Sequence, residues 1–297
     1  MNCPCCSVAK HKDESCTYSH AYVTLGIVHP TDNAYYPIMV EAITPQDGHE
    51  KQDCEQAALH RLLRRFRAEH KTVKATVLTD SIHSKQPTLL LCNELRLNYI
   101  LACKPGSHLT TFDWVNTARC AGDLEQMTER FKKGGFFGTR QCTWMTNVPI
   151  RDSNDAVRVN FISVIEEDPV KGKQTEFTYV TNLSVNRKNV IRRALAGRKR
   201  WKIENECHNT LKNQGYCLEH NYGHGSQHLH FAFTMLIFLA YLFHELLKLV
   251  NQDGLSQLMK RASSRVECFE EFRVTLKRQL YLSWDVLYED LKSWDTS

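Results

Sequence analysis

The stretch KATVLTDSIHSKQPTLLLCNELRLNYILACKPG, residues 74–106, decides the fold class. It opens with a β-branched run that ends in Asp80, and such runs favour strands. Pro87 fits the first turn of a helix and precedes the apolar run LLLCNEL. Residues 98–104 form a second strand-like run, which is stopped by Pro105. A strand, a helix and a strand in this order predict a parallel pair with a right-handed crossover.

The residues before this stretch predict a hairpin and a helix. Residues 17–29 and 34–43 are rich in Tyr, Val and Ile and flank a short segment containing Pro, Asp and Asn, which is typical of two strands around a tight turn. Residues 50–70 carry apolar side chains at helical spacing and predict an amphipathic helix. Because open α/β sheets place their chemistry at the carboxyl ends of strands, Asp80 is the first candidate site residue.

The pattern changes twice further along the chain. Residues 107–183 lose the helical spacing and alternate short strand-like segments with charged turns, so we expect a β-rich insertion there. From Arg187 the chain has a helical pattern almost to its end, with breaks near Gly215, residues 223–225 and Gly254. The sequence therefore predicts an α/β fold with a helical C-terminal region.

Composition narrows the class of protein. With 42% hydrophobic and 24% charged residues, the 297-residue chain matches globular proteins, and its net charge of +5 permits a polyanionic partner without requiring one. The 12 cysteines, in so long a chain without a charged-then-apolar leader, are typical of reduced thiols in the cytoplasm. The longest apolar run, residues 231–243, falls short of the roughly 20 residues that span a bilayer. It predicts a buried helix and no membrane partner.

The densest charge feature is RKNVIRRALAGRKRWK, residues 187–202, in which every charged residue is a cation. It concentrates positive charge where phosphates could bind, although a solvated helix face has the same composition. In the continuation, Arg200, Glu204, His208 and Lys212 recur every four residues and share one side of a helix. Local ion pairing explains this stripe, but a helix carboxylate brought to the strand-end aspartate would form a two-acid Mg²⁺ site for phosphoryl transfer.

Three motifs resemble those of one enzyme family. RWKIE, residues 200–204, is similar to an Arg, three-residue, Glu core. VLTDSIHSKQP and NYILACKPGSH, residues 77–87 and 98–108, resemble the surroundings of a second catalytic aspartate, and LKNQGYCLEHNYGHG, residues 211–225, resembles the tail after a catalytic helix. Over nearly its whole length the chain resembles the DDE transposases of bacterial insertion sequences, in the IS-four-like group with its Tyr-Arg-Glu-Lys signature.

The resemblance implies a ribonuclease H-like fold. Here the mixed sheet would lack its first strand, and a β-rich insertion and an α-helical C-terminal region would accompany it. The expected segments are a partial core at 1–106, the insertion at 107–183, the catalytic helix region that completes the core at 184–225, and the helical region at 226–297.

The resemblance also implies the chemistry. Asp80 and Glu204 would be catalytic and would bind Mg²⁺ or Mn²⁺ for attack on a phosphodiester. The implied partner is double-stranded DNA at the ends of the element, bound by a homodimer. The expected DNA-binding residues are Arg193, Arg198, Arg200, Lys202 and Lys212.

Three positions depart from the family pattern. The first catalytic aspartate is expected on a strand upstream of Cys3, and the nearest acids, Asp47 and Asp53, fall in a loop and a helix start. Gly197 stands where the signature has its tyrosine, and the signature lysine is displaced by one residue to Lys212. We therefore expect a truncated transposase with weak or no activity alone. The alternative is a non-catalytic DNA-binding remnant or regulator of transposition.

A second metal hypothesis rests on the N-terminal cysteines. Cys3, Cys6, His11 and Cys16 have the spacing of a zinc knuckle, which would make the chain an RNA-binding protein. The segment lacks the glycines and aromatic residues of such knuckles, so Mg²⁺ remains the preferred metal. Two other groups are more typical of structure than of a site: the histidines His220, His224, His228 and His230, and the packing stripe Trp284, Tyr288 and Trp294.

Overall fold

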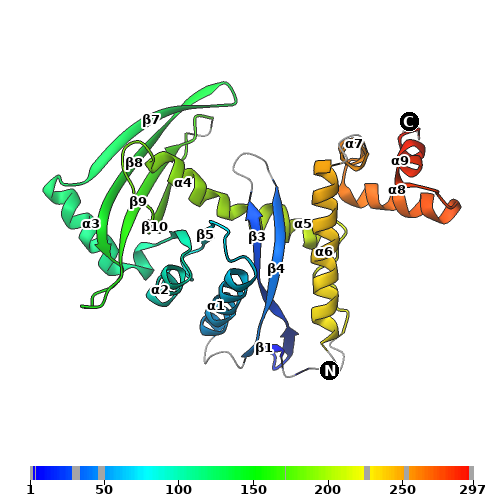
Figure 1. Ribbon diagram of the computed structural model, residues 1–297, viewed down its shortest axis with the longest axis horizontal. Coiled ribbons are helices and arrows are strands. Elements are labelled where there is room, and N and C mark those ends of the chain that lie inside the picture. The colour runs from blue at the N-terminus through cyan, green and yellow to red at the C-terminus, as the bar shows by residue number, and fades with distance from the viewer. Residues whose placement is uncertain are drawn as a thin grey trace. The chain divides into compact units, whose positions relative to one another are not determined.

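The chain folds into two compact units. The computed structural model describes residues 3, 5–28, 34–45, 51–170, 172–223, 228–250 and 254–293 (Figure 1). Unit 1 combines Met1–Pro45 with Lys202–Ser297, and unit 2 is the continuous segment Gln46–Trp201. The expected segment boundaries at residues 106 and 183 both fall inside unit 2.

Unit 2 is built on a six-stranded mixed sheet with the strand order β5-β6-β10-β9-β8-β7. β5 and β6 are parallel, whereas the other neighbouring strands are antiparallel. Because β5 comes first in this order, it is an edge strand of the sheet. The strands are β5 (Thr76–Thr79), β6 (Asn98–Ala102), β7 (Glu125–Lys133), β8 (Phe136–Pro149), β9 (Arg158–Glu167) and β10 (Gln174–Thr181).

The predicted strand, helix and strand at residues 74–104 are confirmed. β5 leads into α2 (Gln86–Glu94), which has Pro87 in its first turn, and α2 leads into β6. The short 3₁₀ turn η2 (Pro105–Ser107) follows. The predicted helix before β5 is also present as α1 (Lys51–Glu69), which packs against α2.

The expectation that residues 107–183 contain no helix is wrong. LTTFDWVNTARCA forms α3 (Leu109–Ala121), which ends at Gly122 in the left-handed conformation with φ 80°. Its Thr, Phe, Trp and Val residues favour strands, but burial of Thr111, Val115 and Ala118 in the packing against β8 overrides that preference. The strands expected here are present, and they extend the sheet of β5 and β6 because β10 pairs with β6.

α4 (Val190–Arg198) and the sheet enclose one of the buried clusters of unit 2. α4 packs across β6, β8, β9 and β10, and the 3₁₀ turn η3 (Lys199–Trp201) follows it. Trp144 and Ile162, which are directly opposite each other on β8 and β9, lie at the centre. The buried cluster consists of Cys142, Trp144, Ile162, Val164, Val185, Val190 and Ala194.

Unit 1 contains two separate hairpins. β1 (Ser7–Lys10) pairs with β2 (Cys16–Ser19), and β3 (Ala21–Val28) pairs with β4 (Tyr35–Ile43). The second hairpin confirms the strand pair predicted at 17–29 and 34–43, while its turn at 29–33 lies outside the described residues.

The rest of unit 1 is helical, as the sequence predicts. The π-helical turn η4 (Ile203–His208) runs into α5 (Asn209–Asn213). After the predicted breaks come α6 (Leu229–Val250), α7 (Leu255–Arg261), α8 (Arg265–Arg278) and α9 (Trp284–Ser293). The first core cluster contains Tyr35, Val40, Cys207, Leu211, Tyr216, Phe238 and Tyr241. The second contains Leu255, Leu258, Cys268, Leu287, Tyr288 and Leu291.

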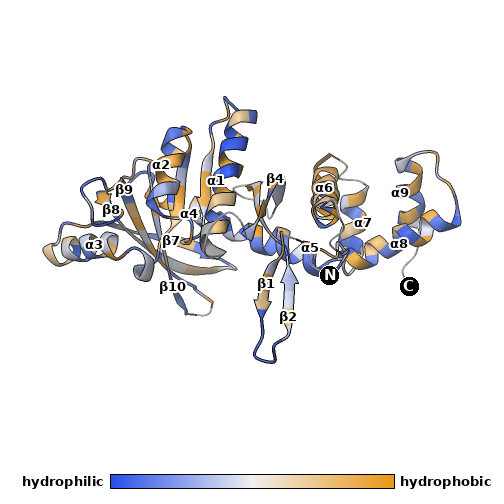
Figure 2. Ribbon diagram, turned by 90° about the horizontal axis from the view of Figure 1, so that it is seen from below, coloured by the Kyte–Doolittle hydropathy of each residue, from blue (hydrophilic) through white to orange (hydrophobic). Residues whose placement is uncertain are grey.

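The expectation of a buried helix at residues 231–243 is only partly right. α6 is 22 residues long and mostly hydrophobic (Figure 2), and among the described helices it alone is long and apolar enough to cross a bilayer. One side carries Phe238 and Tyr241 into the core of unit 1, while Leu236 and Phe243 are exposed. α6 therefore buries one side in the core of unit 1 and leaves apolar side chains exposed on the other.

Candidate functional site

Asp80 lies where the sequence predicts it, directly after β5 at the carboxyl end of the parallel pair. The backbone N–H of Ile82 donates a hydrogen bond to Asp80 Oδ1 at 3.1 Å, which orients the half-buried carboxylate. Within the described part of unit 2, no Lys, Arg or His lies at ion-pair distance from Asp80. The negative charge is thus available to an external cation.

The turn after Asp80 is held from two sides. His83, which is 8% exposed, pairs through Nε2 with Glu55 of α1 at 3.2 Å. His108 Nε2 donates to the Ser84 carbonyl at 2.7 Å, and burial lowers the pKa of His108, so its ring is neutral near pH 7. A fixed turn keeps the Asp80 carboxylate at the sheet edge.

Glu204 lies on the π-helical turn η4, where its side chain is exposed. π turns are rare and occur often at functional sites. The neighbouring Cys207 is buried in the core, and the Tyr241 hydroxyl donates a hydrogen bond to the Glu206 carbonyl, so both contacts hold the turn on the core of unit 1. His208, next along, forms a hydrogen bond with Thr24 Oγ1 at 3.1 Å.

The π turn affects where Lys212, the expected counterpart of the signature lysine, lies on the helix. A π turn accommodates one residue more than an α-helical turn, and η4 lies between Glu204 and Lys212. The π turn therefore changes the angular position of Lys212 around the helix axis, relative to Glu204, from that in a regular α-helix. In unit 1, Lys212 Nζ pairs with Glu219 at 2.6 Å.

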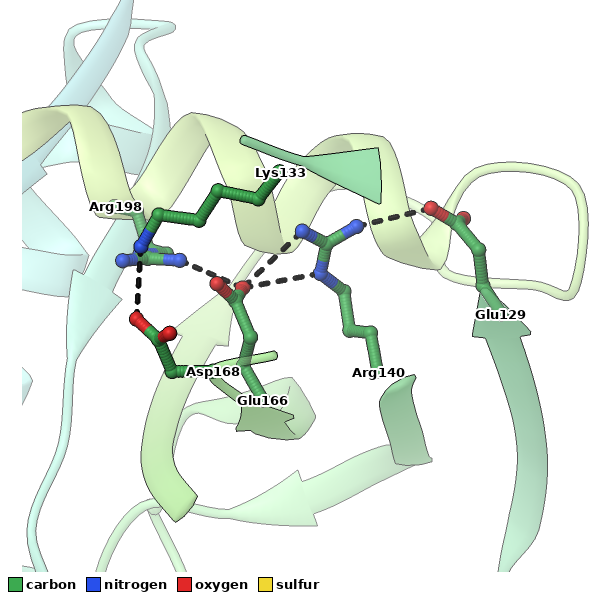
Figure 3. A network of polar contacts seen from close by, with 6 residues as sticks. All are labelled: Glu129, Lys133, Arg140, Glu166, Asp168 and Arg198. Carbon is green, nitrogen blue, oxygen red and sulfur yellow. Dashed lines mark hydrogen bonds and ion pairs between the residues drawn. The ribbon is translucent and has the colours of Figure 1, made fainter. Parts of the chain in front are cut away.

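Arg198, expected at DNA, belongs to a network of charges inside unit 2 (Figure 3). Its guanidinium lies 2.6 Å from Glu166 Oε2, which Arg140 also contacts at 3.1 Å. Arg140 in turn pairs with Glu129 at 2.9 Å. The network joins β7, β8, β9 and α4, so Arg198 holds the helix on the sheet.

The other expected DNA-binding residues differ in accessibility. Lys202 is 1% exposed and Arg193 donates from Nε to the Ser184 carbonyl at 2.9 Å, whereas Arg200 is half-buried on η3. The exposed cations of the basic run are instead Arg187, Lys188 and Arg192. In the described residues none of these three has an ion-pair partner.

The ring of Tyr179 fills the space beside Gly197. A Cβ placed on Gly197 would meet the Tyr179 ring at 2.7 Å, so glycine is required while that ring is present. Tyr179 comes from β10 and is buried. Burial raises the pKa of Tyr179 to about 12, although the charges of Arg198 and Arg200 oppose the shift. The Tyr179 ring of β10 therefore occupies the space that a side chain at position 197 of α4 would need.

A cysteine and histidine cluster lies in unit 1. Cys3 Sγ, Cys6 Sγ and His20 Nε2 lie within 4.8 Å of one another, and among the described residues they are the one such group of three. Cys3 and Cys6 belong to the less favoured zinc-knuckle hypothesis, together with His11 and Cys16, whereas His20 does not, because its spacing from Cys6 matches no short knuckle. The feature that identifies His20 is the β1–β2 hairpin, whose register brings His20 beside Cys6.

The remaining sequence candidates have structural contacts. His230 Nδ1 lies 2.8 Å from the Tyr22 hydroxyl, and the Trp284 and Tyr288 rings stack at 6.1 Å. His224, Trp294 and Asp47 lie outside the described residues, as does the side chain of Asp53 near the start of α1.

Asp80 belongs to unit 2 and Glu204 to unit 1. Joint binding of a metal by these two carboxylates therefore stays a prediction. No protein-family model and no curated protein matches the sequence.

Proposed function

We propose that this chain is a transposase-type protein of the cytoplasm, with a ribonuclease H-like fold. It would act as a homodimer on double-stranded DNA at insertion-sequence ends, by metal-dependent phosphodiester hydrolysis and strand transfer. The observation that carries the proposal is the position of Asp80, an oriented carboxylate without a cationic partner in its own unit, at the carboxyl end of a parallel strand pair.

The chemistry requires hard oxygen ligands and a polarised phosphodiester. The carboxylates of Asp80 and Glu204 fit Mg²⁺ or Mn²⁺, because such cations prefer carboxylate oxygens. When bound, the cation would activate the attacking oxygen and stabilise the leaving one. Asp80, fixed by the Ile82 N–H, would hold its share of the site without rearrangement.

Arg200 and Tyr179 extend the proposed site. Arg200 would bind a DNA phosphate, and the Tyr179 phenol would take the part that the signature assigns to its own tyrosine. The proximity of Tyr179 to the Arg198 and Arg200 charges supports this assignment. Lys212 would bind the phosphate backbone from unit 1, as a point charge.

Two carboxylates supply fewer oxygens than a three-acid site, so we expect weak activity. The test is nicking of supercoiled plasmid DNA in MgCl₂ or MnCl₂, with Asp80→Asn and Glu204→Gln as variants. Slow metal-dependent nicking by the wild type should fall to the metal-free background in both. Asp123→Asn, an exposed acid beyond α3, is the matched control and should nick like the wild type.

Wild-type nicking no faster than that of Asp80→Asn would refute the catalytic proposal. The second candidate, a non-catalytic DNA-binding remnant or regulator, would then remain. The exposed cations Arg187, Lys188 and Arg192 favour it. So does the tip of the β7–β8 hairpin, where Phe136 and Phe137 are exposed beside Lys132, because aromatic residues among cations are typical of nucleic-acid surfaces.

DNA binding is tested separately from cleavage. We expect the affinity for a labelled duplex, measured by fluorescence anisotropy, to fall with salt. Replacing Arg187, Lys188 and Arg192 by Gln should lower the slope of log affinity against log salt by about 1 per cation. The control replaces Lys71 and Lys74, exposed lysines between α1 and β5, and should leave the slope unchanged. Equal slopes in both variants would contradict the assignment of this surface.

A further inference from the structure

The chain segment around Cys3 and Cys6 forms a tight turn. The Cys6 N–H donates to the Cys3 carbonyl at 3.0 Å, and the Cys3 N–H donates to Cys6 Sγ at 3.3 Å. Both thiols therefore face the same side of the turn. The next element, β1, starts at Ser7, which is paired with Ser19 of β2. His20 follows Ser19, so the hairpin returns the imidazole to the cysteines.

The three ligand atoms have the separations of a metal-binding site. Cys3 Sγ and Cys6 Sγ are 3.5 Å apart, and His20 Nε2 lies 3.2 Å from Cys3 Sγ and 3.6 Å from Cys6 Sγ. With Zn–S near 2.3 Å and Zn–N near 2.05 Å, tetrahedral zinc places two sulfurs about 3.8 Å apart and a sulfur and a nitrogen about 3.6 Å apart. All three distances agree to within a few tenths of an ångström.

We propose that Cys3, Cys6 and His20 bind one Zn²⁺ ion. Two thiolates with one imidazole are a soft to borderline donor set, which selects zinc over the hard cations that carboxylates bind. The site belongs to unit 1 whereas Asp80 belongs to unit 2, its donor atoms are of another chemical class, and it does not depend on the proposed nuclease chemistry.

The hairpin register places the proposed site away from His11 and Cys16, the other two residues with zinc-knuckle spacing. Cys16 pairs with Lys10, three residue pairs along the hairpin from Ser7 and Ser19, which is roughly 10 Å at the usual rise of a strand. His11 lies beyond Lys10, where its Nε2 forms a hydrogen bond with Thr17 Oγ1 at 2.6 Å. His11 and Cys16 are therefore at the far end of the hairpin from the thiols of Cys3 and Cys6.

The zinc ion would connect the start of the chain to a helix more than two hundred residues later. The His20 ring stacks on the His230 ring of α6, with centroids 3.5 Å apart and planes 4° apart. His230 Nδ1 also forms a hydrogen bond with the Tyr22 hydroxyl, 208 residues away in sequence. His20, Tyr22 and His230 all line a cleft of about 540 Å³ in unit 1. Metal binding would therefore fix one wall of this cleft.

The experiment uses the full chain, purified under reducing conditions. Metal analysis should find about one zinc ion per chain. Replacement of zinc by Co²⁺ should give the thiolate-to-cobalt charge-transfer absorption and the intense d–d bands of a tetrahedral site. Cys3→Ser, Cys6→Ser and His20→Asn should each lower the metal content to near zero.

The matched controls lie in the same hairpin. Cys16→Ser and His11→Asn should keep both the zinc content and the cobalt spectrum of the wild type. Circular dichroism of each variant shows whether metal loss reflects general unfolding. Wild-type protein without zinc that also fails to take up Co²⁺ would overturn the proposal. A cobalt spectrum that is lost in Cys16→Ser, or unchanged in His20→Asn, would overturn the ligand set.

Discussion

In each unit a glutamate lies between two cations, but the two arrangements are built differently. In unit 2, Glu166 contacts Arg140 and Arg198, which are 26 and 32 residues away in sequence (Figure 3). In unit 1, Glu245 on α6 contacts Lys248 three residues along the same helix, at 2.6 Å, and Arg265 of α8 at 2.8 Å.

This difference shows what each charge cluster stabilises. The Glu166 contacts can form only when β8, β9 and α4 are all in register, so they report on the assembled sheet. The Glu245 contacts depend on one helix and the docking of a second. The Glu166 cluster therefore stabilises long-range strand pairing in unit 2, whereas the Glu245 cluster stabilises the docking of α8 on α6 in unit 1.

The largest effect is expected for Glu245→Gln. The Glu245 side chain is 3% exposed, and its replacement leaves Arg265 and Lys248 close together without the anion between them. Removing one partner of such a buried group costs about 3 kcal/mol of unfolding free energy. Urea unfolding measures the loss, and hydrogen exchange should place it in α6 and α8. A loss below about 1 kcal/mol would contradict the assigned role.

Glu166→Gln should have a smaller effect, about 2 kcal/mol, because Arg198 is 33% exposed and water can solvate it. Hydrogen exchange should localise the change to β8, β9 and α4. Adding Arg198→Met to Glu166→Gln should recover part of the lost stability, since one uncompensated cation is removed. If the double variant is less stable than Glu166→Gln alone, repulsion between Arg140 and Arg198 does not cause the stability loss of Glu166→Gln.

The same glutamate predicts a pH dependence. Burial tends to raise the pKa of Glu166, but the hydrogen bond and charge of Arg198, together with Arg140, lower it below its ordinary value. Its stabilising contribution is thus fully present above the unfolded pKa of about 4.3 and is lost as the pH falls through the lower folded pKa. The unfolding free energy of the wild type should fall more steeply below about pH 4.3 than that of Glu166→Gln. Parallel curves would contradict this.

The smallest effect is expected at the surface of unit 2. Arg64 and Glu94 form an ion pair at 2.7 Å, but both side chains are 57% exposed. Glu94→Gln should change the unfolding free energy by less than about 0.5 kcal/mol, and added salt should remove the difference. A loss of unfolding free energy as large as that in Glu166→Gln would show that the burial of an ion pair does not determine its contribution to stability.

The sequence predicts elements whose signals are local. The strand before Asp80, Pro87 in the first turn of α2 and the strand ended by Pro105 were all predictable, because propensity and turn chemistry act over a few residues. α3 was not predictable because its β-branched and aromatic residues favour a strand, and only packing on β8 decides otherwise.

The site residues divide in the same way. Asp80 follows from its position at a strand end, and Cys3 and Cys6 follow from their spacing. His20 and Tyr179 could not be found by spacing, because hairpin register brings one to the cysteines and the packing of α4 on β10 brings the other to Gly197. The π turn at Glu204 has no local sequence signal that we can identify.

The contact between Tyr179 and Gly197 constrains the order in which this protein can evolve. A larger residue at 197 is tolerated only after the ring at 179 has been lost, since a Cβ there would lie 2.7 Å from that ring. The reverse order passes through an overpacked intermediate that selection would remove. The two positions are thus epistatic, and descendants of this chain should change them as a pair.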